Sequence, residues 1–552
     1  LKYYTEALAI DEQLGNLRGK ARDLNNIGVL LYGKGGLGKA LKYFKEALAI
    51  DEQLGDLREK AVRLNNIGKV LEDKGEVYEA LKYYKETLAI ADQLGDLRGK
   101  ATSLNNIGFL LYGNDELGEA LKHYKEALAI FEQLGDLQGK ATALSNIGSI
   151  LDYKGQVEEA LKYYKEALVI DEQLGDLRGK ATRLSNIGKI LEDISEMDEA
   201  LKYYKEALVI DEQLGDLRGK AIRLSNIGVL LKGKGELDEA LKYYKEALAI
   251  DEQLGDLQGK ATKLNNIGFL LYGKGELDEA LKYYKEALAI DEQLGDLQGK
   301  ATRLNNIGWL LDDKGEVDEA LKYYKEALAI DEQLSDLQGK AIRLNNIGLL
   351  LKGKGELDEA LKYYKEALAI DEQLSDLKGK ATRLSNIGVL LKGKGELDEA
   401  LNYYKEALAI ADQLGDLQGK ASALNNIGSI LDDKGEVDEA LKYYKEALAI
   451  DKQLGDLRGE ATRLNNIGNI HYTRGNYKTA LEFFEESFKI AERLGALQLK
   501  AHRLWWIGTI HGKLNNWSIA IKSFEHSISL YKQMGLNKMV QKVQKSLNSL
   551  KS

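Results

Sequence analysis

Residues 261–300 read ATKLNNIGFLLYGKGELDEALKYYKEALAIDEQLGDLQGK, and this stretch decides the fold. The string LNNIG or LSNIG begins at Leu24 and returns every forty residues up to Leu464, and an altered copy begins at Leu504. No insertion or deletion breaks this register, so successive copies have the same neighbours and the same packing. The sequence therefore predicts an array of stacked repeats.

Each copy contains two stretches with helical spacing. In the quoted copy the first is expected over about 257–272, because the Asp256 carboxylate can cap its N-terminus. Glycines that tolerate positive φ follow at Gly273 and Gly275. The second helix is expected over about 277–294, with Gly295 as its C-terminal signal. Two helices joined by so short a connection form a hairpin.

Apolar residues return at intervals of three and four, which places them on one face of each helix. Small residues among them indicate that the helix axes approach closely. One hairpin cannot bury both stripes, so hairpins must stack into an extended all-α superhelix. The residues expected to pack are Ala261, Leu264, Ile267, Gly268 and Leu271 in the first helix, and Leu277, Ala280, Leu281, Tyr284, Ala287, Leu288 and Leu294 in the second.

The repeat spacing divides the chain into four parts. Residues 1–16 read as the second helix of a partial repeat, and 17–496 as twelve near-identical units of forty residues. Residues 497–535 form a divergent last unit, and 536–552 a polar amphipathic helix that we expect to cap the array. Because the sequence opens inside a unit, we expect further units before Leu1 or another chain over that edge.

The tetratricopeptide repeat has a characteristic spacing of small and large residues, which this chain resembles at Leu264-x2-Ile267-Gly268-x2-Leu271 and Ala280-x3-Tyr284-x2-Ala287. The family's terminal proline would fall at Glu292 and is missing. The forty-residue length resembles the longer subtype of kinesin light chains and of G-protein-signalling modulators of the LGN/Pins kind. The resemblance implies a right-handed superhelical α-solenoid whose first helices line a concave groove for peptides.

Composition argues against several functions. The net charge is −10, from 88 acidic and 78 basic residues of interspersed sign, which disfavours a nucleic-acid partner. No apolar run approaches the roughly 18 residues of a membrane span. Without cysteine the chain forms no disulfide and carries no thiol chemistry. A location in the cytoplasm is favoured, and an extracellular one stays open if Leu1 is a processed N-terminus.

No stretch carries the signature of an enzyme. Residues 33–40 read GKGGLGKA and nearly match a phosphate-binding loop, but Ala40 stands where Ser or Thr must reach Mg²⁺, and a helix precedes it. The histidines lack metal-ligand spacing, and the carboxylates repeat with the array instead of forming one singular pair. We therefore expect no catalytic residue, no metal site and no cofactor.

The face opposite the packing stripe of the first helix carries an asparagine in every unit from Asn26 to Asn466. An amide donates and accepts hydrogen bonds, so a column of amides can bind the backbone of an extended peptide. The alternative is that these amides bond to neighbouring helices and fix the stacking. The expected peptide-binding asparagines are Asn66, Asn106, Asn146, Asn186, Asn226, Asn266, Asn306, Asn346, Asn386 and Asn426.

The residue three positions after this asparagine varies from unit to unit. Its aromatic members Phe109, Phe269 and Trp309 are expected anchors for ligand side chains, although drift at an exposed position explains the variation equally well. The leading hypothesis is a non-catalytic scaffold that binds a protein or peptide segment in its groove. Two alternatives stay open: end-to-end self-assembly into a filament, and a sensor arm of a larger protein.

Overall fold

The computed structural model describes residues 1–551, and every regular element in that range is an α-helix. The chain divides after Glu276 into two compact units. The helices of the first unit are α1 Lys2–Leu14, α2 Leu17–Tyr32, α3 Leu37–Leu54, α4 Leu57–Asp73, α5 Val77–Leu94, α6 Leu97–Gly113, α7 Leu117–Leu134, α8 Leu137–Tyr153, α9 Val157–Leu174, α10 Leu177–Asp193, α11 Met197–Leu214, α12 Leu217–Gly233, α13 Leu237–Leu254 and α14 Leu257–Gly273.

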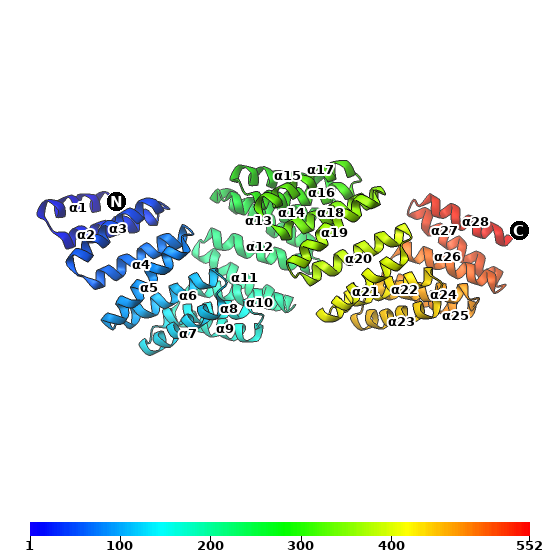
Figure 1. The fold of residues 1–552 in the computed structure, drawn as a ribbon, viewed down its shortest axis with the longest axis horizontal. Coiled ribbons are helices and arrows are strands. Elements are labelled where there is room, and N and C mark those ends of the chain that lie inside the picture. The colour runs from blue at the N-terminus through cyan, green and yellow to red at the C-terminus, as the bar shows by residue number, and fades with distance from the viewer. Residues whose placement is uncertain (552) are drawn as a thin grey trace. The chain divides into compact units, whose positions relative to one another are not determined.

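The second unit repeats the same plan. Its helices are α15 Leu277–Leu294, α16 Leu297–Asp313, α17 Val317–Leu334, α18 Leu337–Lys354, α19 Leu357–Gln373, α20 Leu377–Lys394, α21 Leu397–Leu414, α22 Leu417–Asp433, α23 Val437–Leu454, α24 Leu457–Thr473, α25 Tyr477–Arg493, α26 Leu497–Lys513, α27 Trp517–Gln533 and α28 Asn537–Lys551. Within each unit, consecutive helices pack on one another: a first helix on the second helix that follows it, and that second helix on the next first helix. Figure 1 shows this succession within each unit.

The helices begin and end where the sequence predicts. Asp336 accepts a hydrogen bond from the Gly339 amide at 2.9 Å, which satisfies one of the free N–H groups at the start of α18. Its C-cap Gly355 has φ 83°, the left-handed conformation that glycine adopts without a steric penalty. The same aspartate cap occurs at Asp256, which accepts from Gly259 as predicted.

The predicted close approach of the helices is confirmed at the repeated glycine. A Cβ atom added to Gly348 of α18 would lie 2.8 Å from Cε1 of the buried Tyr364 in α19. The expected packing stripe was wrong at the end of the second helix, where Leu294 is 42% exposed. Ile290 and Asp291 are buried in its place, because the last turn rotates them toward the following first helix.

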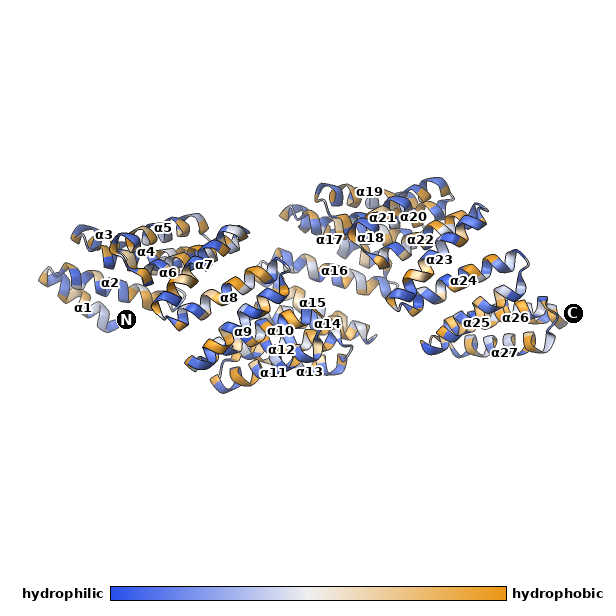
Figure 2. Cartoon of the chain, turned by 90° about the horizontal axis from the view of Figure 1, so that it is seen from below, coloured by the Kyte–Doolittle hydropathy of each residue, from blue (hydrophilic) through white to orange (hydrophobic). Residues whose placement is uncertain are grey.

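Helix surfaces are amphipathic throughout, and Figure 2 shows hydrophilic and hydrophobic residues alternating along them. None of the described helices is both long and apolar enough to span a membrane. On the polar side, lysines join neighbouring repeats: the Lys340 ammonium lies 2.9 Å from Glu332 and 3.0 Å from Glu366, so that it links α17, α18 and α19. Such exposed pairs contribute little individually, about 0–1 kcal/mol each.

Candidate functional site

The asparagine column forms a ladder of hydrogen bonds between successive first helices. The second asparagine of one unit donates its Nδ2–H to the Oδ1 atom of the first asparagine in the preceding unit. The donor nitrogen lies 2.8–3.0 Å from the acceptor oxygen in the pairs Asn66–Asn25, Asn106–Asn65, Asn146–Asn105, Asn346–Asn305, Asn386–Asn345 and Asn466–Asn425. Part of each of these amides therefore contributes to repeat stacking.

These amides keep further hydrogen-bonding capacity. An asparagine side chain has two N–H groups and an oxygen with two lone pairs. The bond to the preceding unit takes one N–H of Asn66, and the side chain is only half-buried. Stacking and ligand binding are therefore compatible uses of the same residue.

Exposed apolar side chains flank the asparagines on both sides along the first helices. On α18, Ile342 lies four residues before Asn346 and Leu349 three residues after it, so all three share one helix face. Ile342 is 37% exposed and Leu349 is 45% exposed. We call the equivalent residues of the first helices the first-helix face, and its exposed apolar members are Val29, Val62, Phe109, Ile222, Val229, Phe269, Trp309, Ile342, Leu349 and Val389.

The predicted aromatic anchors lie exposed on this face, and the two phenylalanines lie next to lysines. The Lys69 ammonium lies 5.6 Å from the ring centroid of Phe109, and that of Lys232 lies 4.8 Å from the centroid of Phe269. Cations over aromatic rings are attracted by about 0.5–1 kcal/mol at exposed sites. The two phenylalanines and Trp309 are each 39–50% exposed, so a large part of every ring can contact a partner.

Beneath this face, most repeats are joined by a buried ion pair that the sequence analysis missed. An aspartate in the last turn of a second helix meets an arginine or lysine twelve residues later, on the next first helix. Nitrogen and oxygen lie 3.1–3.4 Å apart in Asp51–Arg63, Asp171–Arg183, Asp211–Arg223, Asp251–Lys263, Asp291–Arg303, Asp331–Arg343, Asp371–Arg383 and Asp451–Arg463.

Burial dominates the electrostatics of these pairs. It raises the pKa of Asp331, and the charge of Arg343 opposes this rise. Burial also lowers the pKa of Arg343. Taking both charges out of water is costly and offsets much of their attraction, so the pair fixes how repeats join more than it adds stability.

The signal that reveals these pairs is a paired change within the array. At three junctions between a second helix and the next first helix, both members of the pair are replaced together. Ala91 faces Ser103, Phe131 faces Ala143, and Ala411 faces Ala423, and every one of these side chains is buried. At these three junctions loss of the acid is accompanied by loss of the base, as expected when an unpaired buried charge is destabilising. Two other junctions depart from this pattern, because Asp23 replaces the base opposite Asp11, and Ala491 replaces the acid opposite Arg503.

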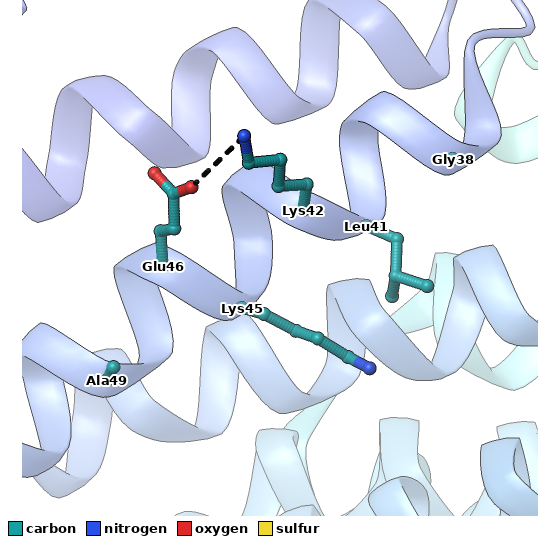
Figure 3. A pocket seen from close by; sticks show the side chains of 6 residues that line it. All are labelled: Gly38, Leu41, Lys42, Lys45, Glu46 and Ala49. Atoms are coloured by element: carbon teal, nitrogen blue, oxygen red, sulfur yellow. Dashed lines mark ion pairs between the residues drawn. The ribbon is translucent and has the colours of Figure 1, made fainter.

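Two hollows in the first unit differ in what they bring together. A cavity of about 630 Å³ lies between α4, α5 and α6, at the junction that has Ala91 and Ser103. A second hollow of about 490 Å³ lies on the outer surface of α3 and is lined by residues of that helix alone (Figure 3). Its Lys42 and Glu46 form an exposed pair at 3.9 Å, and it is too open to hold a ligand by burial.

The residues considered for enzymatic chemistry lie in positions that serve packing. Ala40, at the end of the stretch that nearly matches a phosphate-binding loop, is fully buried as a packing residue of α3. The described residues contain no cluster of three or more His, Asp or Glu side chains able to hold a metal ion. His502 is half-buried beside Arg503, and desolvation lowers its pKa to about 4, so it is neutral at physiological pH.

Comparison with known proteins identifies the repeat. The profile of the tetratricopeptide repeat family matches residues 61–133, 99–173, 139–213, 179–253, 259–333, 340–413 and 419–493, which together cover most of the chain. The chain therefore belongs to the tetratricopeptide repeat family, and the resemblance inferred from the motif is confirmed. Arrays of this repeat are scaffolds for protein–protein interaction and are typically not catalytic.

Solved structures with related folds cover only part of the chain. The crystal structure of BtubC (BKLC) from P. vanneervenii is 21% identical, with a TM-score of 0.38, and covers 40% of this chain and 92% of its own. The apo form of RapI is 15% identical, with a TM-score of 0.41, and covers 50% of this chain and 99% of its own. No curated protein matches the sequence.

Proposed function

We propose that this chain is a non-catalytic scaffold that binds an extended or helical segment of another protein along its first-helix face. The observation that supports the proposal best is the combination of half-buried amides with exposed apolar side chains on the same helix face, as at Ile342, Asn346 and Leu349. The amides supply hydrogen bonds to a peptide backbone whatever its sequence. The flanking apolar residues, which differ between repeats, supply the choice among partners.

The physical argument concerns the apolar surface that the first-helix face exposes to water. Burying an exposed apolar side chain at an interface contributes about 25 cal/mol per Å² of apolar area removed from water. The exposed members recur on successive repeats, so a segment that runs along the array contacts several of them at once. Multiple modest contacts on one tethered segment add up to specific binding.

The test compares two sets of exposed apolar residues with equal numbers of substitutions. The binding variant carries Val62→Ser and Phe109→Ser, on the first-helix face of the neighbouring helices α4 and α6. The control carries Val169→Ser and Val209→Ser, which are equally exposed but lie on second helices. Binding partners are selected from a displayed library of random twelve-residue peptides, and affinities are measured by fluorescence anisotropy.

The binding variant should lose affinity for the selected peptides by about tenfold or more, and the control should keep it. Equal losses in the two variants, or none in either, would contradict binding on this face. Asn346→Ala is measured alongside, with hydrogen exchange of α16 and α18 as a check on stacking. A loss of affinity without faster exchange assigns the amide to the ligand, and faster exchange alone assigns it to stacking.

A further inference from the structure

The cavity of about 630 Å³ between α4, α5 and α6 is the starting point. It lies where the buried ion pair of most junctions is replaced by Ala91 on α5 and Ser103 on α6. Ala61 and Asn65 of α4 and Thr87 of α5 also line it. The two smaller side chains are themselves buried, at 3% and 1% exposed, so they form the floor of a polar space that opens beside the first-helix face.

One other junction shows what such a space can hold. Between α25 and α26, Ala491 stands at the position of the aspartate, yet the arginine is kept as Arg503. Its Nε–H donates to Ser487 Oγ at 2.7 Å, and its Nη1–H to Asn465 Oδ1 at 2.7 Å. Its Nη2–H donates to the backbone oxygen of Ala461 at 3.3 Å. A buried guanidinium is thus held without a carboxylate.

The same acceptors recur in the cavity. The four residues around Arg503 correspond, ten repeats earlier in the array, to the residues that line the cavity, with threonine in place of one serine. The pairs are Ala461 and Ala61, Asn465 and Asn65, Ser487 and Thr87, and Ala491 and Ala91. The arginine lacks a counterpart, because Ser103 stands at its position. Asn106, which stands where the last copy has Trp506, donates its Nδ2–H to Asn65 Oδ1 at 2.9 Å, so the second lone pair of that oxygen is the one left for an occupant.

Thr87 is also unusual for its column. The hydroxyl group replaces an alanine that occupies this position in the neighbouring second helices, including Ala47, Ala127 and Ala407. Its Oγ1–H donates to the Tyr83 backbone oxygen at 3.0 Å, so its lone pairs are what it offers to the cavity. Ser103 likewise donates its proton to Gly99 O at 2.9 Å. The cavity therefore presents acceptors and favours an occupant rich in donors.

The charges around the cavity permit a cation. Arg58 and Arg98 line it together with Glu59 and Asp96, so the formal charges cancel. Arg98 is already paired with Asp136 at 2.8 Å. Arg458, the counterpart of Arg58, lines the space beside His502, next to Arg503, so a basic residue there is compatible with a buried guanidinium. The net charge of −10 adds a general attraction for basic segments.

We infer that this cavity is a specificity subsite that binds the guanidinium of an arginine side chain on the partner segment. The inference rests on the proposed function, since the arginine arrives on a segment bound to the first-helix face. The aliphatic part of the arginine packs against Ala91, and its N–H groups donate to Thr87 Oγ1, Asn65 Oδ1 and the Ala61 carbonyl. A guanidinium group is preferred over an ammonium group here, because its N–H donors point in several fixed directions and can reach all three acceptors.

The test uses the peptides selected from the random library on the full chain. Arginine should be enriched at one fixed position. Synthetic peptides with that arginine replaced by citrulline, which has the same shape without the charge, should bind about tenfold more weakly or worse. Ala91→Asp with Ser103→Arg fills the cavity with the array's own Asp–Arg pair, which seven other junctions already contain. This variant should bind the arginine peptide and the citrulline peptide with equal affinity.

The matched control is Ala411→Asp with Ala423→Arg, a junction where Ala407 offers no hydroxyl, and it should keep the preference for arginine. Thr87→Ala is a second, milder variant and should reduce the preference. Peptides selected without an arginine preference, or a preference that survives filling of the cavity, would overturn the inference and leave the proposed function intact. If the chain selects no peptide, the proposed function fails and the subsite with it.

Discussion

Removing one partner of the buried pair Asp331–Arg343 should destabilise the α17–α18 junction far more than removing both. The Arg343 Nε and Asp331 Oδ2 atoms lie 3.2 Å apart, with the carboxylate fully buried. Arg343→Ala leaves that carboxylate without its cation, which typically costs about 3–5 kcal/mol. The double substitution to alanine reproduces the Ala411–Ala423 junction of the same unit, so we expect a cost of at most about 2 kcal/mol.

The loss of stability caused by Arg343→Ala should increase from acid toward neutral pH. Burial raises the pKa of Asp331, and Arg343 is the group that lowers it, so its removal raises the pKa further. A group whose pKa is raised on folding stabilises the fold below its unfolded pKa, about 3.9, and loses this contribution as pH rises through the folded value. The variant should therefore approach the wild type in acid and fall behind it toward neutral pH.

Hydrogen exchange read by mass spectrometry on the full chain suits this measurement, because a repeat array opens locally. At about 1.4 kcal/mol per factor of ten, the expected cost makes amides of α17 and α18 exchange about two to three and a half orders of magnitude faster in Arg343→Ala. Amides of α21 and α22 in the same protein serve as an internal control and should be unchanged. A double variant as destabilised as the sum of the single ones would refute the reasoning.

Two further predictions concern local geometry and are checked by the same exchange measurement. Gly348→Ala should destabilise α18 and α19 because its Cβ would lie 2.8 Å from the Tyr364 ring, whereas Gly353→Ala, with no atom within 4 Å, should gain about 0.5–1 kcal/mol. Asp376→Ala removes the bond from the Gly379 amide at 2.9 Å and should cost about 1 kcal/mol at neutral pH. Since that bond lowers the Asp376 pKa, the difference from wild type should begin to shrink as the pH falls below about 4 and vanish below the lowered pKa of the folded state.

The fold was predictable because its signals are local and occur many times. Caps such as Asp256 and the glycine at 348 act within one turn or one hairpin, so spacing alone identifies them. The prediction that Leu294 packs in the core was wrong because the last turn of a helix packs on the next repeat. Helical periodicity within one repeat does not specify that contact. Asp291 was missed for the same reason, since its partner Arg303 belongs to the following helix.

The candidate site was predictable in position but not in its contacts. The first-helix face was identified because its residues lie opposite the packing stripe, and Phe109 and Leu349 are indeed exposed. The bond from Asn66 to Asn25 depends on how two repeats stack, which residue spacing alone does not determine. Peptide binding by these amides, end-to-end assembly and a sensor-arm role stay predictions.

Comparison between copies also shows where the stacking bonds of the asparagine column are weak or absent. At three junctions the acid and base of the buried pair change together, which is expected of residues that serve each other. The second asparagine instead stays the same when its acceptor changes to serine, at Ser145, Ser185, Ser225 and Ser385. In the described part of the chain only Asn226 then donates to the serine, at a long 3.4 Å. We therefore expect the second asparagine to have a role besides stacking, and the comparison of affinity and hydrogen exchange in Asn346→Ala tests this expectation.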